Sequence, residues 1–473
     1  MALNNADREL AFTPAYQLKE LILKKQLSPV ELLDAILRRV EEINPKLNAY
    51  LTLTREEAYQ AARRAEKVIT DGDTAGPLHG IPISIKDLVE MKGIRTTFGS
   101  LPTRDNIPQT EDGTMIRRLK RAGAVIIGKT NTPEFGLASH TENRIANTLN
   151  PWNTDRTPGG SSGGASAAVA SGISPLAQGS DGGGSIRIPS ALSGIFGIKP
   201  TNGRVPMDVH GWGMSHVSCW GPMTRNVRDA ALMLNVIAGP DGMDYTCIRT
   251  QPPDYLAALK KKQDTLRIAY SADLGYVVRV DPAVASAFEQ AVKVFESLGH
   301  NLEAATPRVK EPFDLWDINA STRYSIPYGS LIETHPDELS DYTRTYLGIA
   351  RDATGVEVAR SWIEVEKTRA EMLSFFEKYD LLLAPVTAVP APKIGQRDKS
   401  LGKGGIDWVF CPFTAIFNFS QNPGASVPCG FTPDGLPVGL QIIGRIQDEA
   451  TVLRAAAAFE EACPWADKYP PIS

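Results

Sequence analysis

Helical and strand-like patterns of apolar residues alternate along the first half of the chain. Ser28 and Glu31 flank Pro29 in a capping box, which predicts a helix running towards Ile43. Other stretches show either a helical composition or a short apolar run typical of a buried strand. We expect further helices at 55–70 and 114–122, and strands at 81–86, 124–127 and 174–178. This alternation predicts an α/β fold in which helices sandwich a mixed central β-sheet.

A change of composition near residue 250 marks the start of a different region. Pro252 and Pro253 are followed by three lysines at 260–262. Beyond them we expect a strand at 266–270, a helix capped by Asp281, mostly helical structure at 311–375, and a return to the sheet at 427–443. The chain thus predicts one domain, 1–473, with N-terminal helices (1–64), a core (65–250 and 405–473) and an inserted, largely helical lobe on the substrate side (251–404).

Composition and charge favour a globular enzyme. The 473 residues are 42% hydrophobic, which is enough to bury a large core. The net charge of −4 does not indicate a nucleic-acid partner. Five widely spaced cysteines and six scattered histidines form no ligand motif, so we expect no disulfide framework, no metal and no other cofactor. Without a signal-like start or a membrane-length apolar run, the expected compartment is the cytoplasm, with no membrane partner.

One stretch imitates a nucleotide-binding loop. Gly123 and Gly128 enclose the run Ala124–Ile127 and are followed by Lys129 and Thr130, which fits the P-loop pattern. A real P-loop follows a strand and opens a helix, whose first N–H groups bind phosphate. Here a predicted helix comes first, and the run between the glycines is itself typical of a buried strand. We therefore expect this segment to bind no nucleotide.

Two glycine- and serine-rich segments and one lysine carry the strongest chemical signal. Gly159–Gly164 contains Ser161, and Ser180–Arg187 contains Ser185. A serine hydroxyl becomes a nucleophile when a base takes its proton, and a lysine is such a base only when burial keeps its amine neutral. Lys86 ends a run in which isoleucines alternate with other residues, so the predicted strand places it opposite the isoleucine face.

Each of these parts also has a simpler interpretation. A glycine–serine cluster is more often a linker, and a lysine at the end of a strand is usually a solvated charge. The helix-forming run Ala165–Ala170 directly follows the first cluster, which argues against a linker. The combination of Lys86 with both serine segments therefore favours a catalytic site.

In this combination the chain resembles the amidase signature family. The resemblance extends to segments around the serine motifs, namely Asn44–Tyr50, Asn150–Asn153, Gly197–Val205 and Gly435–Gln441. It implies a Ser–cis-Ser–Lys triad with Ser185 as the nucleophile, Ser161 as the bridging residue on a cis peptide with Gly160, and Lys86 as the base.

Backbone amides supply the remaining chemistry of acyl transfer. Consecutive glycines let the main chain aim N–H groups at a developing oxyanion without a Cβ in the way. The candidates for this oxyanion hole are Gly182, Gly183, Gly184 and the N–H of Ser185.

Three further residues are candidates for a supporting role. Ser162 follows the bridging serine directly. Asp181 and Arg187 are either ordinary surface charges or a buried pair that braces the nucleophile loop, and the sequence leaves both interpretations open.

The substrate is predicted less directly than the chemistry. Many glutamine amidotransferases of the family have Thr and Gln where this chain has Gly182 and Ile188, which weakens but does not exclude the role of a glutamine-dependent amidotransferase A-type subunit. The loops expected to line a pocket are 135–145, 207–220, 316–328 and 411–419. The aromatic residues in and beside them are Trp212, Trp220, Trp316, Phe410, Phe413 and Phe417. Aromatic walls favour aryl or long-chain amides, anilides and aryl carbamates.

The sequence as a whole therefore predicts a serine amidohydrolase that forms an acyl-enzyme on Ser185. We expect its partner to be a small amide or carbamate, with urethanase or esterase side activity. The expected assembly is a monomer or a homodimer.

Overall fold

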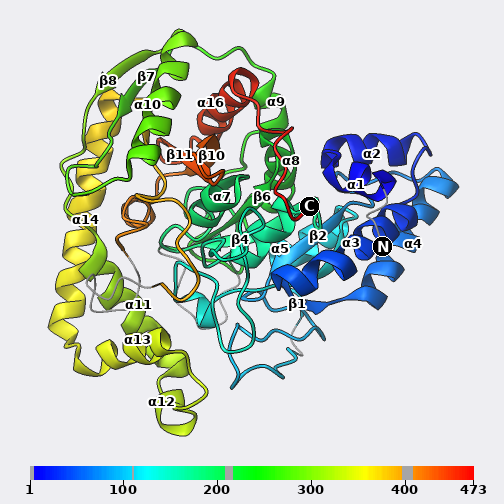
Figure 1. Cartoon of the computed structure of the whole chain (residues 1–473), viewed down its shortest axis with the longest axis horizontal. Coiled ribbons are helices and arrows are strands. Elements are labelled where there is room, and N and C mark those ends of the chain that lie inside the picture. The colour runs from blue at the N-terminus through cyan, green and yellow to red at the C-terminus, as the bar shows by residue number, and fades with distance from the viewer. Residues whose placement is uncertain (1–4, 109–110, 208–216, 397–407) are drawn as a thin grey trace.

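The central β-sheet is built from strands that come from the beginning, middle and end of the chain (Figure 1). The structure is a computed structural model that describes residues 5–108, 111–207, 217–396 and 408–473. The strands are β1 (Tyr50–Leu53), β2 (Pro82–Lys86), β3 (Val125–Thr130), β4 (Leu176–Asp181), β5 (Phe196–Lys199), β6 (Cys219–Thr224), β7 (Arg267–Tyr270), β8 (Asn301–Ala304), β9 (Leu381–Pro385), β10 (Gly424–Phe431) and β11 (Pro437–Gly444).

Within the described residues, the sheet has 11 strands in the order β1-β3-β2-β4-β6-β5-β10-β11-β9-β7-β8. The sheet is mixed, because β3, β2 and β4 run parallel to one another whereas β4 and β6 are antiparallel. The predicted α/β class with a mixed central sheet is thus confirmed.

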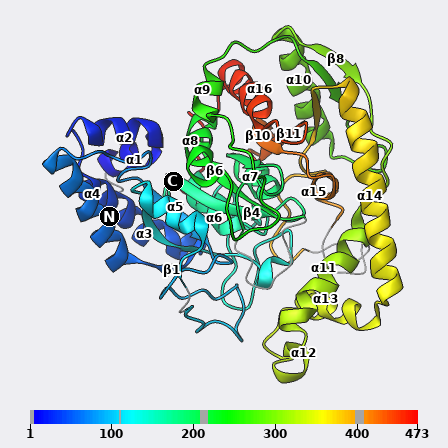
Figure 2. The same cartoon turned by 180° about the vertical axis from the view of Figure 1, so that it is seen from behind.

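Helices cover this sheet along most of its length. The first group comprises α1 (Asn5–Phe12), α2 (Ala15–Leu23), α3 (Pro29–Leu47) and α4 (Arg55–Asp71). The second group comprises α5 (Thr114–Arg121), α6 (Gly163–Ala170), α7 (Arg187–Ser193), α8 (Val227–Ile237), α9 (Tyr255–Leu259), α10 (Pro282–Ser297), α15 (Ile416–Phe419) and α16 (Glu449–Ala462). The third group comprises α11 (Phe313–Tyr328), α12 (Leu331–Thr334), α13 (Asp341–Asp352) and α14 (Gly355–Lys378). Figures 1 and 2 show α1–α4 and α11–α14 at opposite ends of the molecule.

Local capping explains where two of the predicted helices begin. The hydroxyl of Ser28 accepts a hydrogen bond from the N–H of Val30 at 3.0 Å, and the Glu31 carboxylate accepts one from the N–H of Ser28 at 3.0 Å. This capping box is the predicted one, and α3 continues past Ile43 to Leu47. The predicted cap Asp281 accepts from the N–H of Ala283 at 2.8 Å and opens α10.

The segment 251–404 contributes strands as well as helices. Its helices α11–α14 form the helical part that the sequence predicts, but β7, β8 and β9 extend the central sheet beyond β11. The segment is therefore part of the same sheet rather than a purely helical insertion. The boundaries proposed for the parts of the domain stay predictions.

Two neighbouring parallel strands determine where the candidate site lies. Every residue of β2 is buried, and Ile83 and Ile85 pair with Leu176 and Gln178 of β4. Because parallel strands end at the same edge of a sheet, the last residue of β2, Lys86, lies beside the carboxyl end of β4.

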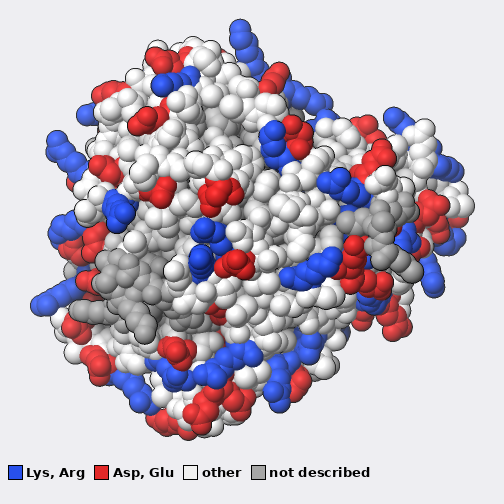
Figure 3. All heavy atoms as spheres, in the orientation of Figure 1, with Lys and Arg blue, Asp and Glu red and all other residues white. Residues whose placement is uncertain are grey.

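The surface carries charges of both signs. On the face shown in Figure 3, basic and acidic side chains are interspersed, and neither sign dominates. Among the described residues, the longest apolar helical stretches fall short of what a membrane crossing requires.

Candidate active site

The side-chain amine of Lys86 is buried among serine hydroxyls. Its side chain is 0% exposed. The amine Nζ lies 2.6 Å from Oγ of Ser161, 2.9 Å from Oγ of Ser162 and 3.0 Å from Oγ of Ser180. The structure thus brings together the predicted lysine and both serines of the first motif, and adds Ser180, which the sequence did not single out.

Burial changes the acid–base behaviour of this lysine. Desolvation lowers the pKa of Lys86 well below its ordinary value, and the charge of Asp181 opposes the shift only in part. A neutral amine at moderate pH is what a general base in this position needs, and the sequence predicted it from the buried strand.

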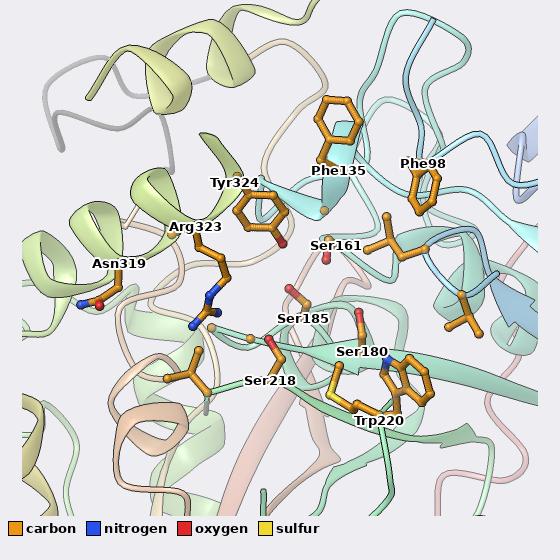
Figure 4. A pocket seen from close by; sticks show the side chains of 18 of the residues that line it. Phe98, Phe135, Ser161, Ser180, Ser185, Ser218, Trp220, Asn319, Arg323 and Tyr324 are labelled. Carbon is orange, nitrogen blue, oxygen red and sulfur yellow. The ribbon is translucent and has the colours of Figure 1, made fainter. Parts of the chain in front are cut away.

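The two serine segments meet in front of Lys86. The peptide between Gly160 and Ser161 is cis, as the resemblance implied. The N–H of Ser162 donates to the backbone carbonyl of Ser185 at 3.2 Å, which ties the first motif to the second. Ser161 and Ser185 both line the same pocket, and Figure 4 shows their hydroxyls facing its interior.

The carboxylate of Asp181 organises the turn that carries Ser185. It accepts hydrogen bonds from the N–H groups of Gly184 (2.8 Å) and Ile186 (3.2 Å), and from the guanidinium of Arg187 (2.9 Å). Burial by itself would raise the pKa of Asp181, but the charge and hydrogen bonds of Arg187 outweigh it and lower that pKa. Asp181 therefore stays ionised inside the protein.

Arg187 is held from the other side of the turn as well. Its guanidinium donates to Gln441 and Asn418 at 2.7 Å each, and to the carbonyl oxygen of Thr414 at 3.0 Å. Both Asp181 and Arg187 are 0% exposed. Of the two interpretations left open by the sequence, the buried pair is the right one.

The glycines before Ser185 are fixed through their backbone atoms. The indole N–H of Trp316 donates to the carbonyl of Gly182 at 3.0 Å, and the hydroxyl of Thr414 donates to the carbonyl of Gly183 at 2.6 Å. The N–H of Gly184 donates to Asp181. The amide of Gly184 is therefore already engaged by Asp181, and Gly184 has to be removed from the predicted oxyanion donors.

A pocket opens above these serines and has mostly apolar and aromatic walls (Figure 4). The predicted wall residues Trp220 and Trp316 line it. Phe410, Phe413 and Phe417 instead pack in the hydrophobic core, so their assignment to the pocket was wrong. Trp212 lies outside the described residues.

The predicted wall segment 316–328 lies on a helix rather than on a loop. Ala320, Arg323 and Tyr324 share one face of α11 with Trp316, as their three- and four-residue spacing requires, and they line the pocket. Tyr328, one turn further on, stacks on Phe135 with ring centroids 3.7 Å apart. Other lining residues from predicted segments are Met207, Val217 and Phe419, whereas Leu88 and Phe98, which follow β2, were missed.

The P-loop look-alike has a structural role. Lys129 and Thr130 lie in β3, so the lysine follows strand residues and opens no helix. The buried amine of Lys129 lies 3.2 Å from the carboxylate of Asp87 and donates to the hydroxyl of Thr96 at 2.7 Å. These contacts support the segment after Lys86. In the described part of the chain, no group of three or more His, Cys, Asp or Glu residues is arranged to hold a metal.

Comparisons with known proteins agree with this geometry. The profile of the Amidase family matches residues 31–453. The chain is 39% identical to an acylamidase from Rhodococcus erythropolis, over 98% of each chain. It is 38% identical to the A-type subunit of a glutamyl-tRNA(Gln) amidotransferase from Carboxydothermus hydrogenoformans, over 96% of this chain and 98% of that one.

A solved structure supports the same relationship. A bacterial aryl acylamidase of the amidase signature family superposes with a TM-score of 0.88 at 31% identity, covering 96% of this chain and 97% of that one. The family match, the sequence identity and the fold therefore place this chain in the amidase signature family.

Proposed function

Because this chain belongs to the amidase signature family and is a hydrolase of C–N bonds, we propose that it cleaves carboxamides through an acyl-enzyme on Ser185. The observation that carries this proposal is the buried amine of Lys86, which contacts three serine hydroxyls and has a lowered pKa. Within the described residues no carboxylate forms an ion pair with Lys86, so this buried amine is suited to move a proton rather than to stabilise the fold.

The contacts of Lys86 support one direction for the proton relay. A neutral amine has two N–H groups to donate and one lone pair to accept. The hydroxyl of Ser162 donates to the carbonyl of Ser180 at 3.2 Å, so it accepts from Lys86. The shortest contact of Lys86 is the 2.6 Å contact with Ser161, which we assign to the lone pair because O–H donors form shorter hydrogen bonds than N–H donors. Ser161 then donates its proton to Lys86, and Ser180 accepts the second N–H.

We propose the following reaction for this arrangement. Lys86 takes the proton of Ser161 while Ser161 takes that of Ser185, and the oxygen of Ser185 attacks the carbonyl carbon of the amide. The C–N bond of the tetrahedral intermediate breaks, and the relay returns the proton to the leaving nitrogen. Water then attacks the ester on Ser185, which releases the acid and restores the hydroxyl.

Backbone amides stabilise the negative charge on the intermediate in this proposal. With the amide of Gly184 donating to Asp181, the donors we assign are the N–H groups of Gly182, Gly183 and Ser185. Gly182 and Gly183 line the pocket together with Ser185, which supports this assignment.

We further propose aryl amides and anilides as the preferred substrates. The walls formed by Phe98, Phe135, Trp220, Trp316 and Tyr324 suit a flat ring, and the compared solved structure is that of an aryl acylamidase. Aryl carbamates present the same planar carbonyl with a nitrogen leaving group, so we include urethane cleavage in the expected range.

An amidotransferase role is the second candidate, favoured by the 38% identity to an amidotransferase chain. A hydrolysis panel separates the two. The isolated chain should hydrolyse an anilide and an aryl carbamate faster than a short primary amide, with free glutamine the poorest substrate. Ser185→Ala serves as the control. Ammonia release from glutamine, without turnover of anilides or carbamates, would contradict the proposal and favour the second candidate.

A further inference from the structure

Helix α11 reaches the nucleophile loop through one indole. Trp316 donates its N–H to the carbonyl oxygen of Gly182 at 3.0 Å. A Cβ on Gly183 would lie 2.6 Å from this indole nitrogen, so the indole packs directly against the Gly182–Gly183 backbone. The same side chain lines the pocket, which means that it faces both the loop and the space for the substrate.

The orientation of one peptide unit depends on this contact. In a trans peptide the carbonyl and the following N–H point in opposite directions. The hydrogen bond from Trp316 therefore fixes the direction of the N–H of Gly183 through the carbonyl of Gly182. The next peptide unit is anchored independently, because the carbonyl of Gly183 accepts from Thr414 and the N–H of Gly184 donates to Asp181.

The indole of Trp316 also lies in contact with two other aromatic residues. Its ring makes edge contacts with Tyr346 of α13 at 5.6 Å and with Trp408 at 5.5 Å between centroids. The indole N–H of Trp408 points elsewhere, to the carboxylate of Asp317 at 3.4 Å. Trp408 thus shares the packing of Trp316 without contacting the loop, which makes it a matched control.

We propose that Trp316 is a positioning residue that aims the amide of Gly183 at the oxyanion and so couples filling of the pocket to transition-state stabilisation. This inference rests on the proposed acyl-transfer function. A ring of the substrate that packs against the indole holds it over Gly182, so part of the binding energy is realised in the transition state. Substrates that leave the indole uncovered should lose turnover as well as affinity.

The test replaces the indole by a ring without an N–H. Trp316→Phe keeps an aromatic wall but removes the donor to Gly182. We expect kcat for an anilide to fall about tenfold, with KM changed much less, since an oxyanion donor that is directly removed costs about 10²–10³ in kcat and this one is only misaligned. A trifluoromethyl ketone analogue, whose adduct with Ser185 carries the oxyanion, should lose affinity by a similar factor.

Trp408→Phe is the control for packing. It trims the same aromatic cluster, so a purely structural effect would lower activity and melting temperature in both variants. We expect Trp408→Phe to keep near-normal kcat and ketone affinity. Equal losses in both variants, or a Trp316→Phe effect confined to KM, would overturn the positioning role.

Failure of the underlying function would look different. If Ser185→Ala retained anilide turnover, the acyl-enzyme proposal itself would be wrong, and the role of Trp316 with it. If Ser185→Ala is inactive and Trp316→Phe has normal kcat and ketone affinity, only the inference about Trp316 fails.

Discussion

At the scale of single residues, the proposed mechanism depends on a lysine whose charged form the fold disfavours. Lys86 is fully buried, and its amine contacts serine hydroxyls rather than a carboxylate. Desolvation favours the neutral form of a cationic group, which is why the pKa of Lys86 is lowered well below its ordinary value. Burial of this lysine lowers the stability of the fold, but it also favours the neutral amine that can act as the base.

The pH dependence of turnover follows from this shift. Lys86 works only when neutral, so activity falls as pH drops through its lowered pKa and stays high in the mildly alkaline range. Lys86→Ala should lose about a hundredfold or more in kcat. Its pH–rate profile should also lack the acidic limb, in which the rate falls as pH decreases. The limb should persist when His79 or His140 is replaced. Initial rates across pH check this, and loss of the limb in a single histidine variant would exclude the lysine mechanism.

At the scale of elements, the turn between β4 and α7 depends on a buried ion pair. Asp181 ends β4 and Arg187 begins α7, and both are 0% exposed. Removing one partner of such a pair leaves an uncompensated charge in the interior. The turn carries Ser185, so the stability of the turn and the position of this proposed nucleophile are linked.

Arg187→Met should therefore destabilise the protein by about 3–5 kcal/mol, as measured by chemical denaturation. The matched control is Arg351→Met, which breaks an ion pair with Glu333 whose side chains are 53% and 75% exposed. An exposed pair contributes about 0–1 kcal/mol, so this variant should unfold almost like the wild type. Similar stabilities for the two variants would mean that the buried pair does not brace the turn.

Sequence patterns predicted the elements that carry the proposed triad better than those that build the pocket. Lys86, Ser161 and Ser185 lie in short motifs whose residue types are fixed by the chemistry, and β2 and β4 are apolar runs. Phe413 and Phe417 could not be separated from wall residues, because an aromatic residue in a loop looks the same whether it faces a core or a pocket. The role of β7–β9 in the sheet likewise depends on long-range pairing.

At the scale of the whole molecule, the central sheet brings distant segments to one edge. β2 and β4 run parallel, which places Lys86 beside Ser180. Helix α11, which comes much later in the chain, lines the pocket through Asn319, Arg323 and Tyr324 (Figure 4). The carbonyls of the nucleophile loop are held by Trp316 and Thr414, which come from two further parts of the chain. The site exists only in the folded protein.

The most direct measurement of the central claim is to trap the acyl-enzyme. The protein is quenched in acid during turnover of an activated anilide, digested, and sequenced by mass spectrometry between Ser161 and Ser185. The proposed mechanism predicts one acyl group on Ser185, absent from Ser185→Ala and formed far more slowly in Lys86→Ala. An acyl group on Ser161 or Ser162, or undiminished turnover by Ser185→Ala, would contradict it.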